Sequence, residues 1–293
     1  MAGFRELLAV EWDDNAVQTF RLNFPDVPVY HGDIVKLSVE ECLRLTGLEP
    51  GQLDVLDGSP PCQGFSTAGK RVLDDPRNSL FQEYVRLLRG LRPRAFVMEN
   101  VSGMVKGKMK LVFAETLREL KASGYKVSAR LLNAMYFNVP QSRQRLIFIG
   151  VREDLNEAPS HPLASRRPFT AQEAWQGVTD DGTGERVGAH TKIWQAMRSV
   201  LPGQSQPGHY SHQRLKAYAP SPTIQKANGL AHYHLWHPSE QRVITLVECK
   251  RLASFPDTWQ FMGTVAEAWE RIGNSVPPLF MRAIAQHVRK LLP

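Results

Sequence analysis

An α/β fold with a parallel sheet covered by helices is predicted by three observations on this sequence. In the first half, short β-like apolar runs alternate with stretches whose apolar residues recur at helical spacing. Each apolar run ends in polar residues. From about residue 153 the composition changes. Residues 156–240 are rich in Pro, Gly, Ser and His and show only weak hydrophobic periodicity. We therefore expect a sheet domain followed by a smaller, irregular one.

The predicted elements follow in chain order. We expect strands at residues 7–11, 27–30, 53–56, 95–98, 126–132 and 146–151, and helices at residues 78–91, 109–122, 192–200, 245–252 and 279–292. A turn is expected at residues 273–278. The expected division is a first domain at residues 1–155, an irregular domain at 156–262, and a segment at 263–293 that returns to the first domain.

Composition limits the classes of protein that fit. The 293 residues carry a net charge of +7, which favours a polyanionic partner. No run of about 18 apolar residues or signal peptide occurs, so a membrane location is not expected. The three cysteines are widely spaced and form no CxxC pair, which argues against a disulfide framework and a metal site and fits a reducing cytoplasm.

The polar residues that end the predicted strands should converge. In an open α/β sheet, ligands bind beyond the carboxyl ends of the strands. Four such ends carry Glu11, Asp33, Cys62 and Glu99. These side chains are therefore expected along one rim of the sheet, as parts of an active site.

Three signals on this rim each have a simpler interpretation. Cys62 lies in residues 59–66 (SPPCQGFS), where two prolines stiffen the approach to an exposed thiol, although free cysteines are commonly buried. Glu99 follows an apolar run, but Asn100 beside it could simply cap a helix. Arg143 and Arg145 share one face of a predicted strand, which could also be a solvated basic edge.

Taken in order, the motifs resemble those of bacterial DNA (cytosine-5)-methyltransferases. They are PCQ at residues 61–63, ENV at 99–101, QxRxR at 141–145 and GNSVPP at 273–278, with further similarity at 75–81, 132–140 and 242–257. The resemblance covers almost the whole chain. It implies a Rossmann-like sheet that uses S-adenosylmethionine, with a smaller target-recognition domain and double-stranded DNA as the partner.

The resemblance also implies a mechanism. Cys62 would add to carbon 6 of a flipped-out cytosine, so that carbon 5 can accept a methyl group. Glu99 would hold and protonate ring nitrogen 3. Arg143 would contact the oxygen at position 2 and help to hold Cys62 and Glu99, while Arg145 supports the site.

Cofactor and DNA contacts are implied residue by residue. Glu11 would take the ribose hydroxyls and Trp12 would stack on adenine, unless Trp12 is an ordinary core aromatic. The full cofactor set is Glu11, Trp12, Asp33, Ile34, Pro60, Leu80, Asn274, Ser275 and Val276. The implied DNA contacts are Gln63, Ser66, Lys70, Arg71 and Arg77 on a closing lid, and Thr223 and Ile224 in the recognition domain. Arg214, near this domain's Thr-Ile pair, could also contact DNA, or it could be an ordinary solvated charge.

One departure from the family pattern concerns its opening element. The family normally begins with a strand, an aromatic-Gly-x-Gly turn and a helix, whereas here residues 1–4 come just before the strand at 7–11. About 20 residues would therefore be missing. A permuted chain order would place this element later in the sequence. The later Gly182-Thr183-Gly184 follows no apolar run, so it is interpreted as a surface turn and does not support a permutation. We expect weak cofactor binding unless an upstream segment or a partner polypeptide supplies the element.

Four functions are compared on these grounds. An active DNA methyltransferase, belonging to a restriction system or acting alone, accounts for every motif. A truncated or partner-dependent remnant that binds DNA without turnover accounts for the missing opening element. An RNA methyltransferase of related design is disfavoured by the well-developed residues 156–240. A nicotinamide-dependent dehydrogenase leaves Cys62, Glu99 and Arg143 unexplained.

Overall fold

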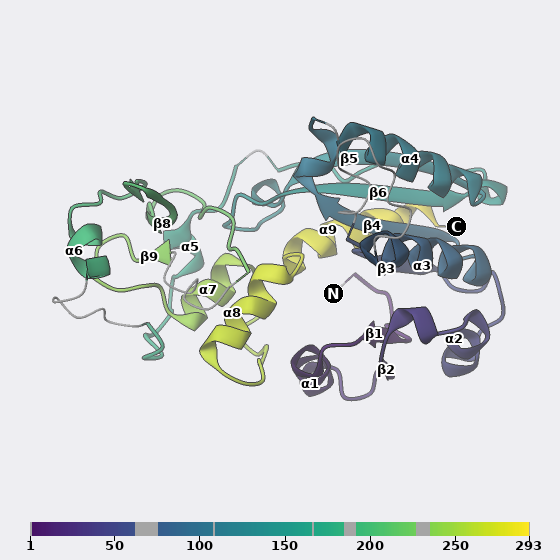
Figure 1. Ribbon diagram of the computed structural model, residues 1–293, viewed down its shortest axis with the longest axis horizontal. Coiled ribbons are helices and arrows are strands. Elements are labelled where there is room, and N and C mark those ends of the chain that lie inside the picture. The colour runs from purple at the N-terminus through teal and green to yellow at the C-terminus, as the bar shows by residue number, and fades with distance from the viewer. Residues whose placement is uncertain are drawn as a thin grey trace.

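The computed structural model describes residues 2–61, 76–107, 109–165, 167–184, 192–226 and 235–292. Figure 1 shows a sheet with helices on both faces at one end of the molecule and a lobe of short elements at the other. Helices α8 (Val265–Asn274) and α9 (Pro278–Leu291) run between these two parts. No helix in the described ranges is both long and apolar enough to cross a bilayer.

Four strands form the larger sheet, in the order β3 (Val55–Gly58), β4 (Ala95–Val101), β6 (Gln144–Arg152) and β5 (Tyr125–Asn133). The first two are parallel, whereas β6 runs antiparallel to both of its neighbours. The expectation of a parallel sheet is therefore wrong for β6, which alone of these four strands runs opposite to the others. Only residues 134–143 join β5 to β6, and a parallel crossover needs a longer connection.

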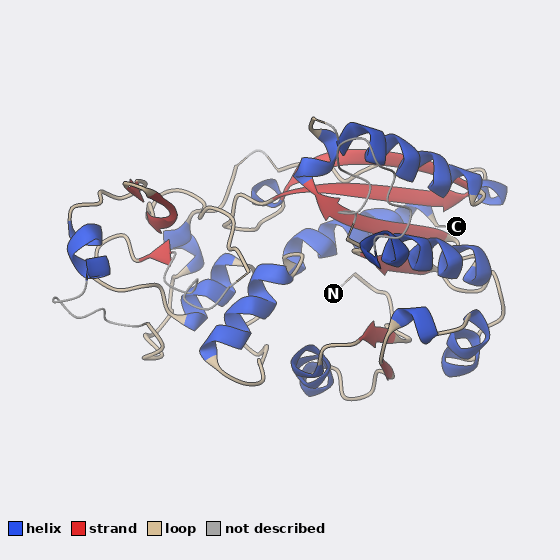
Figure 2. Ribbon diagram, viewed as in Figure 1, coloured by secondary structure: helices blue, strands red, loops and turns tan. Residues whose placement is uncertain are grey.

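Helices cover both faces of this sheet (Figure 2). On one face, α3 (Pro76–Leu91) and α4 (Met109–Ala122) pack against Phe96 and Met98 of β4. On the other face, α9 packs against Ala95 and Val97. This alternation along β4 is what a strand buried on both faces requires.

A separate, two-stranded sheet is formed by β1 (Ala9–Glu11) and β2 (Val29–His31), which pair in parallel. Helix α1 (Asp14–Asn23) connects the two strands, and η1 (Ile34–Lys36) and α2 (Val39–Thr46) follow β2. No backbone pairing joins β1 to β3 within the described part of the chain. An apolar cluster with members from both sheets, including Val10 and Leu56, nevertheless packs them against each other.

The second lobe contains short elements around a common core. They are α5 (Ala171–Ala174), α6 (Lys192–Arg198), α7 (Leu246–Leu252) and the three-stranded sheet β7 (Ser205–Gln206), β8 (His209–Arg214) and β9 (Leu235–Trp236). Helix α8, which was not predicted, packs into the same core through Trp269 and Ile272. Gly273 and Asn274, which were predicted to lie in a turn, lie in the last turn of α8.

Short 3₁₀ turns follow three strands of the larger sheet, two of them near the predicted rim and one at the opposite end of the sheet. They are η2 (Ser102–Val105), η3 (Ala134–Tyr136) and η4 (Glu153–Leu155). The turn η2 directly follows Val101 at the carboxyl end of β4. The turn η3 begins the connection from β5 to β6.

Candidate active site

An ion pair joins Glu99 and Arg145 at one rim of the larger sheet. Glu99 lies near the carboxyl end of β4 opposite Ile147, and Arg145 lies two residues before Ile147 on β6. The two side chains therefore project from the same face of the sheet. The Nε of Arg145 lies 2.6 Å from Oε1 of Glu99, with the side chains only 15% and 14% exposed. The antiparallel register thus places a charged pair where the sequence predicted an active site.

Burial and charge act in opposite directions on this arginine. Desolvation lowers the pKa of Arg145 below its ordinary value, and the carboxylate of Glu99 partly offsets that effect. The guanidinium stays charged at neutral pH, because an arginine pKa begins far above 7. It therefore fixes the orientation of Glu99 through a charge-assisted hydrogen bond.

Asn100 holds the chain that leads to Cys62. Its Nδ2 donates to the carbonyl oxygen of Pro60 at 3.1 Å, and its Oδ1 accepts from the amide of Val101. Asn100 is buried and is not the N-cap of the turn that follows, so its interpretation as a simple cap is wrong. It ties the end of β3 to the end of β4, two residues before Cys62.

Several predicted site residues lie outside the described residues. They are Cys62, Gln63, Ser66, Lys70 and Arg71. The backbone of Arg77 lies in the first turn of α3. Their predicted roles therefore stay predictions.

Arg143 makes different contacts from those expected. Its Nη1 donates to the carbonyl oxygen of Ile224 at 3.1 Å, and its Nη2 donates to that of Gly273 at 2.9 Å. The expectation that Arg143 holds Glu99 is wrong, because Arg145 makes that contact. The physical reason is that β6 begins at Gln144, so Arg143 precedes the strand and does not follow its alternation.

The segment of residues 221–226, here called the recognition segment, is bonded to the residues that precede β6. The amide of Ser221 donates to Pro140 and that of Ser142 donates to Ser221. The hydroxyl of Thr223 donates to the carbonyl oxygen of Ser142 at 2.7 Å. This ladder places residues 221–226 close to the start of β6 and so to Arg145.

Two predicted DNA contacts in this region need correction. Ile224 is fully buried in the apolar core of the second lobe, so its side chain is not available to DNA in this structure. Arg214 is also buried, and its guanidinium donates to the carbonyl oxygens of Met197 and His237. Thr223 remains half-buried beside them. The sequence pattern identified the segment, but not which side chains face outward.

The end of β1 presents an acid and an exposed aromatic ring. Oε1 of Glu11 accepts hydrogen bonds from the amides of Trp12 and Asp13, at 2.8 and 3.1 Å. Trp12 is 78% exposed, which excludes its interpretation as a core aromatic. Asp33 follows β2 and caps η1 by accepting from the amide of Val35. These groups lie at the carboxyl ends of the two parallel strands, as predicted.

The remaining predicted cofactor residues lie on neighbouring elements. Ile34 and Leu80 are half-buried and Pro60 is buried. Residues 273–276, here called the cofactor segment, comprise the last two residues of α8 and the first two of its connection to α9. Within this segment Asn274 is exposed, while Ser275 and Val276 are half-buried.

Helix α8 and the loop before it are bonded to α1, which sequence reasoning did not predict. Arg271 forms an ion pair with Asp13 at 3.1 Å. The Nδ2 of Asn15 donates to the carbonyl oxygen of Met262, and the amide of Met262 donates to the hydroxyl of Thr19. These bonds hold the cofactor segment near the end of β1. Only tertiary structure brings such partners together, because about 240 residues separate them in sequence.

Comparison with known proteins identifies the family. Residues 1–290 match the C-5 cytosine-specific DNA methylase family. The chain belongs to this family. It is 33% identical to the type II methyltransferase M1.HphI of Haemophilus parahaemolyticus, over 99% of this chain and 82% of that protein. It is 31% identical to M.XorII of Xanthomonas oryzae pv. oryzae, over 99% and 81% of the two chains.

Solved structures support the same fold. A prophage-encoded E. coli protein, assigned as a candidate DNA modification methyltransferase, superposes with a TM-score of 0.81 at 26% identity, covering 99% of this chain and 93% of that one. A DNMT2 protein of Spodoptera frugiperda superposes with a TM-score of 0.70 at 18% identity, covering 97% and 91%, and shows the fold alone. The predicted α/β methyltransferase fold is confirmed.

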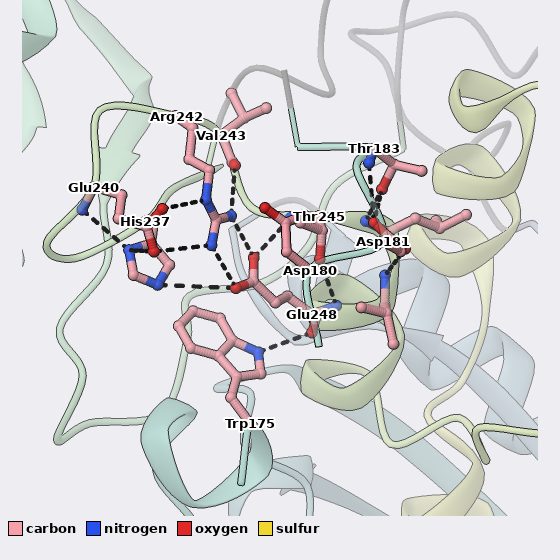
Figure 3. Close-up of polar contacts among 12 residues, drawn as sticks. Trp175, Asp180, Asp181, Thr183, His237, Glu240, Arg242, Val243, Thr245 and Glu248 are labelled. Atoms are coloured by element: carbon pink, nitrogen blue, oxygen red, sulfur yellow. Dashed lines mark hydrogen bonds and ion pairs between the residues drawn. The ribbon is translucent and has the colours of Figure 1, made fainter. Parts of the chain in front are cut away.

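A buried ion pair organises the second lobe (Figure 3). Arg242 donates to both carboxylate oxygens of Glu248, at 2.8 and 2.9 Å. Glu248 also caps α7 by accepting from the amide of Thr245. The ring of His237 lies 5.5 Å from that of Trp175, stacked at 15°. The similarity at residues 242–257 thus corresponds to a structural core.

The Gly182-Thr183-Gly184 turn contributes to the same core. The hydroxyl of Thr183 accepts from the amide of Leu246 at 2.7 Å, and Oδ2 of Asp181 accepts from that of Val247 at 3.1 Å. Together they satisfy amides at the start of α7, which otherwise have no partner within the helix. The predicted turn is present, and its role is to cap α7.

Proposed function

We propose that this chain transfers a methyl group from S-adenosylmethionine to carbon 5 of a cytosine in double-stranded DNA, through a covalent adduct with Cys62. The observation that carries the proposal is the Glu99–Arg145 ion pair, because it lies beside the Pro60 carbonyl that Asn100 fixes. A carboxyl group, a guanidinium and the approach to a cysteine therefore meet at one rim. This set suits a reaction in which a thiolate adds to a ring that must be polarised.

Each residue has a separate part in the proposed reaction. The thiolate of Cys62 forms a bond to carbon 6, and the displaced electron pair makes carbon 5 nucleophilic. Glu99 delivers a proton to ring nitrogen 3 as this charge develops. Arg145 orients Glu99, and we assign to it the contact with the oxygen at position 2 that was expected of Arg143. After methylation, water or hydroxide takes the carbon-5 proton, β-elimination frees the thiolate, and ring nitrogen 3 returns its proton to Glu99.

The residues at the ends of β1 and β2 fit the proposed cofactor. S-adenosylmethionine supplies an electrophilic methyl group on a sulfonium. Glu11 would bind its ribose hydroxyls, Trp12 would stack on its adenine, and Asp33 with Ile34 would read the adenine edge. The exposure of Trp12 leaves its ring available for stacking. Pro60, Leu80 and the cofactor segment would enclose the methionine part.

DNA would reach the site by base flipping. The net charge of +7 favours a polyanion, and a cytosine within a duplex is accessible to Cys62 only after extrusion. We assign residues 156–262 to target recognition and residues 63–78 to a lid over the flipped base. In this proposal the enzyme acts in the cytoplasm, where the thiol of Cys62 stays reduced, and it serves a restriction–modification system or acts alone.

Covalent trapping tests the proposed chemistry. Duplex DNA containing 5-fluorocytosine at the target position, with S-adenosylmethionine, should yield an adduct that survives denaturation, because fluorine blocks the final proton removal. Cys62→Ala should abolish the adduct, whereas Cys42→Ala should retain it, since Cys42 is a buried residue of α2. Absence of the adduct in protein shown to bind both ligands would contradict the mechanism.

The lack of backbone pairing between the two sheets favours a second version of this proposal, in which methyl transfer depends on a partner polypeptide or an added segment. β1 and β3 each have one neighbour on their outer side, and neither pairs with the other among the described residues. The residues that precede β1 nevertheless lie close to β3, because Leu8 packs in the same apolar cluster as Leu56. We propose that a further strand–turn–helix element beside β1 and β3 completes the cofactor site.

Supplying this element tests the partner-dependent form. A strand–Gly-loop–helix segment can be added as an N-terminal extension or expressed as a separate chain, and methyl transfer to duplex DNA is then measured. Either arrangement should raise the rate over that of the 293-residue chain. An unchanged rate in a chain that is already active would show that the element is not needed.

A further inference from the structure

Arg143 joins three segments that are far apart in sequence. Its main-chain amide donates to Oδ1 of Asn133 at the end of β5. Its guanidinium donates to the carbonyl oxygens of Ile224, in the recognition segment, and Gly273, in the cofactor segment. The side chain is only 3% exposed. One buried group therefore contacts the catalytic sheet, the segment assigned to DNA and the segment assigned to cofactor.

The recognition and cofactor segments also touch each other directly. A Cβ atom placed on Gly273 would lie 2.5 Å from the carbonyl oxygen of Gln225. Because that oxygen belongs to the backbone, the clash could not be relieved by rotating a side chain. Lys226 forms an ion pair at 2.7 Å with Glu270, one turn earlier on α8. The two segments are thus in backbone contact beside Arg143. A displacement of either one must be transmitted to the other or break these contacts.

The chemistry of an arginine suits this junction. Burial lowers the pKa of Arg143 to about 10, so the guanidinium remains charged at neutral pH. Its planar fork reaches two carbonyl oxygens at once, whereas a lysine ammonium is a single point charge on a flexible stem. The catalytic contact with Glu99 is made by Arg145 instead. Arg143 is therefore free to hold the two segments together.

We infer that Arg143 is a positioning residue that couples DNA binding at the recognition segment to the conformation of the cofactor segment. The inference rests on the proposed function, in that the recognition segment belongs to the region assigned to DNA and the cofactor segment to the region assigned to the cofactor. DNA that orders the recognition segment would stabilise the cofactor segment through Arg143. By linkage, cofactor binding would strengthen DNA binding by the same factor.

Amide hydrogen exchange, measured on the whole chain, tests the positioning part without any ligand. Arg143→Lys should speed exchange of the amides of Ser221, Ile224 and Ser275 by roughly tenfold to a hundredfold, as expected for the loss of a charged hydrogen bond. Arg214→Lys is the matched control, because Arg214 is also buried and donates to carbonyl oxygens within the second lobe. It should speed exchange near Leu215 and His237 and leave Ser275 unchanged.

The same measurement with duplex DNA tests the coupling. In the wild type and in Arg214→Lys, DNA should slow exchange at Ser275 by about fivefold or more, the lower range of typical couplings. In Arg143→Lys this slowing should disappear while protection within the recognition segment remains. If Ser275 is protected equally in all three proteins, the coupling does not pass through Arg143.

Failure of the inference can be separated from failure of the proposed function. DNA that binds the wild type but leaves Ser275 unprotected would overturn the coupling and leave the methylase function intact. Absence of DNA binding would count against the proposed function, and the ligand-free comparison would still decide the role of Arg143. Equal exchange at Ser221, Ile224 and Ser275 in Arg143→Lys and the wild type would overturn the positioning role.

Discussion

The four-stranded sheet and the two-stranded sheet, here called the four-stranded part and the two-stranded part, are held in place by different interactions. In the four-stranded part, continuous backbone pairing fixes β3, β4, β6 and β5, and its register alone brings Glu99 and Arg145 together. In the two-stranded part, β1 and β2 pair only with each other among the described residues, and side-chain bonds to α8 and its preceding loop hold α1.

This difference bears on function. The residues proposed to act on the base lie on the part fixed by backbone pairing. The residues proposed to bind the ribose and adenine lie on the part held by apolar packing and a few side-chain bonds, some of them exposed. Exposed polar bonds contribute little to stability individually. The geometry of the residues that act on the cytosine, here called the base side, should therefore be robust. The residues that bind the ribose and adenine, here called the cofactor side, should move more readily when a single contact is removed.

The largest expected effect is on the base side. Cys62→Ala should reduce methyl transfer to background while DNA binding persists, because only the covalent step requires the thiol. Transfer is measured with a labelled methyl group, and binding by a mobility shift on the same duplex. Residual transfer well above background would remove Cys62 from the nucleophile role and would mean that the base side works differently.

Glu99→Gln should lower the single-turnover rate by about 10²–10⁴, the usual contribution of a general acid. Asp54→Asn is a matched control, because Asp54 pairs with Arg94 where β3 and β4 begin, away from the rim. The control should retain the wild-type rate. Equal rates for Glu99→Gln and wild type would show that the ion pair with Arg145 is only structural.

The sequence predicted the elements of the four-stranded part well. Helix α4 has the predicted bounds, Met109–Ala122, because its apolar residues repeat at helical spacing. The strands β5 and β6 were placed within a few residues, but their antiparallel pairing was not predicted. Local pattern identifies a strand, whereas its direction depends on the length of the connection.

The site was predicted in composition but not in its contacts. Glu99 and Arg145 were both named, yet the sequence assigned the Glu99 contact to Arg143. Alternation could not show that β6 begins after Arg143. The bond between Arg271 and Asp13 left no local signal, because its partners meet only in the folded chain. Motif order therefore identified the residues, and tertiary structure assigned their partners.

A smaller effect is expected on the cofactor side. Trp12→Ala should weaken S-adenosylmethionine binding by about tenfold, because the stacking of one base on an aromatic ring contributes roughly this much. Tyr218→Ala removes another exposed aromatic ring, from the second lobe, and should leave cofactor affinity unchanged. Affinity is measured by calorimetric titration, which does not rely on tryptophan fluorescence. Equal losses in both variants would contradict a specific role for Trp12.

The smallest expected effect is a pH dependence of stability. Desolvation and, second, the charge of Asp57 raise the pKa of Glu6 from 4.5 to about 7. Between these two values the unfolded chain has released a proton that the folded chain retains, so stability falls as the pH rises. Glu6→Gln should therefore be more stable than the wild type above pH 7 and equal to it below pH 4.5.

Because the side chain of Glu6 is partly exposed, the difference should stay below about 1 kcal/mol. Chemical unfolding at pH 4 and pH 8 measures it. Asp57→Asn should reduce the same pH dependence, since it removes the neighbouring negative charge. A Glu6→Gln variant that is less stable than the wild type at pH 8 would reverse the predicted sign. It would mean that Glu6 makes a favourable contact in its charged form.

Calorimetric titration of S-adenosylmethionine tests the contrast between the two parts of the sheet most directly. The titration compares the 293-residue chain with a chain extended by a strand, a Gly-containing loop and a helix. We predict weak binding for the first and tight binding for the second, because the loop amides and an added strand would complete the cofactor side. Equal, tight binding by both chains would contradict this account and show that β1 and β2 hold the cofactor unaided.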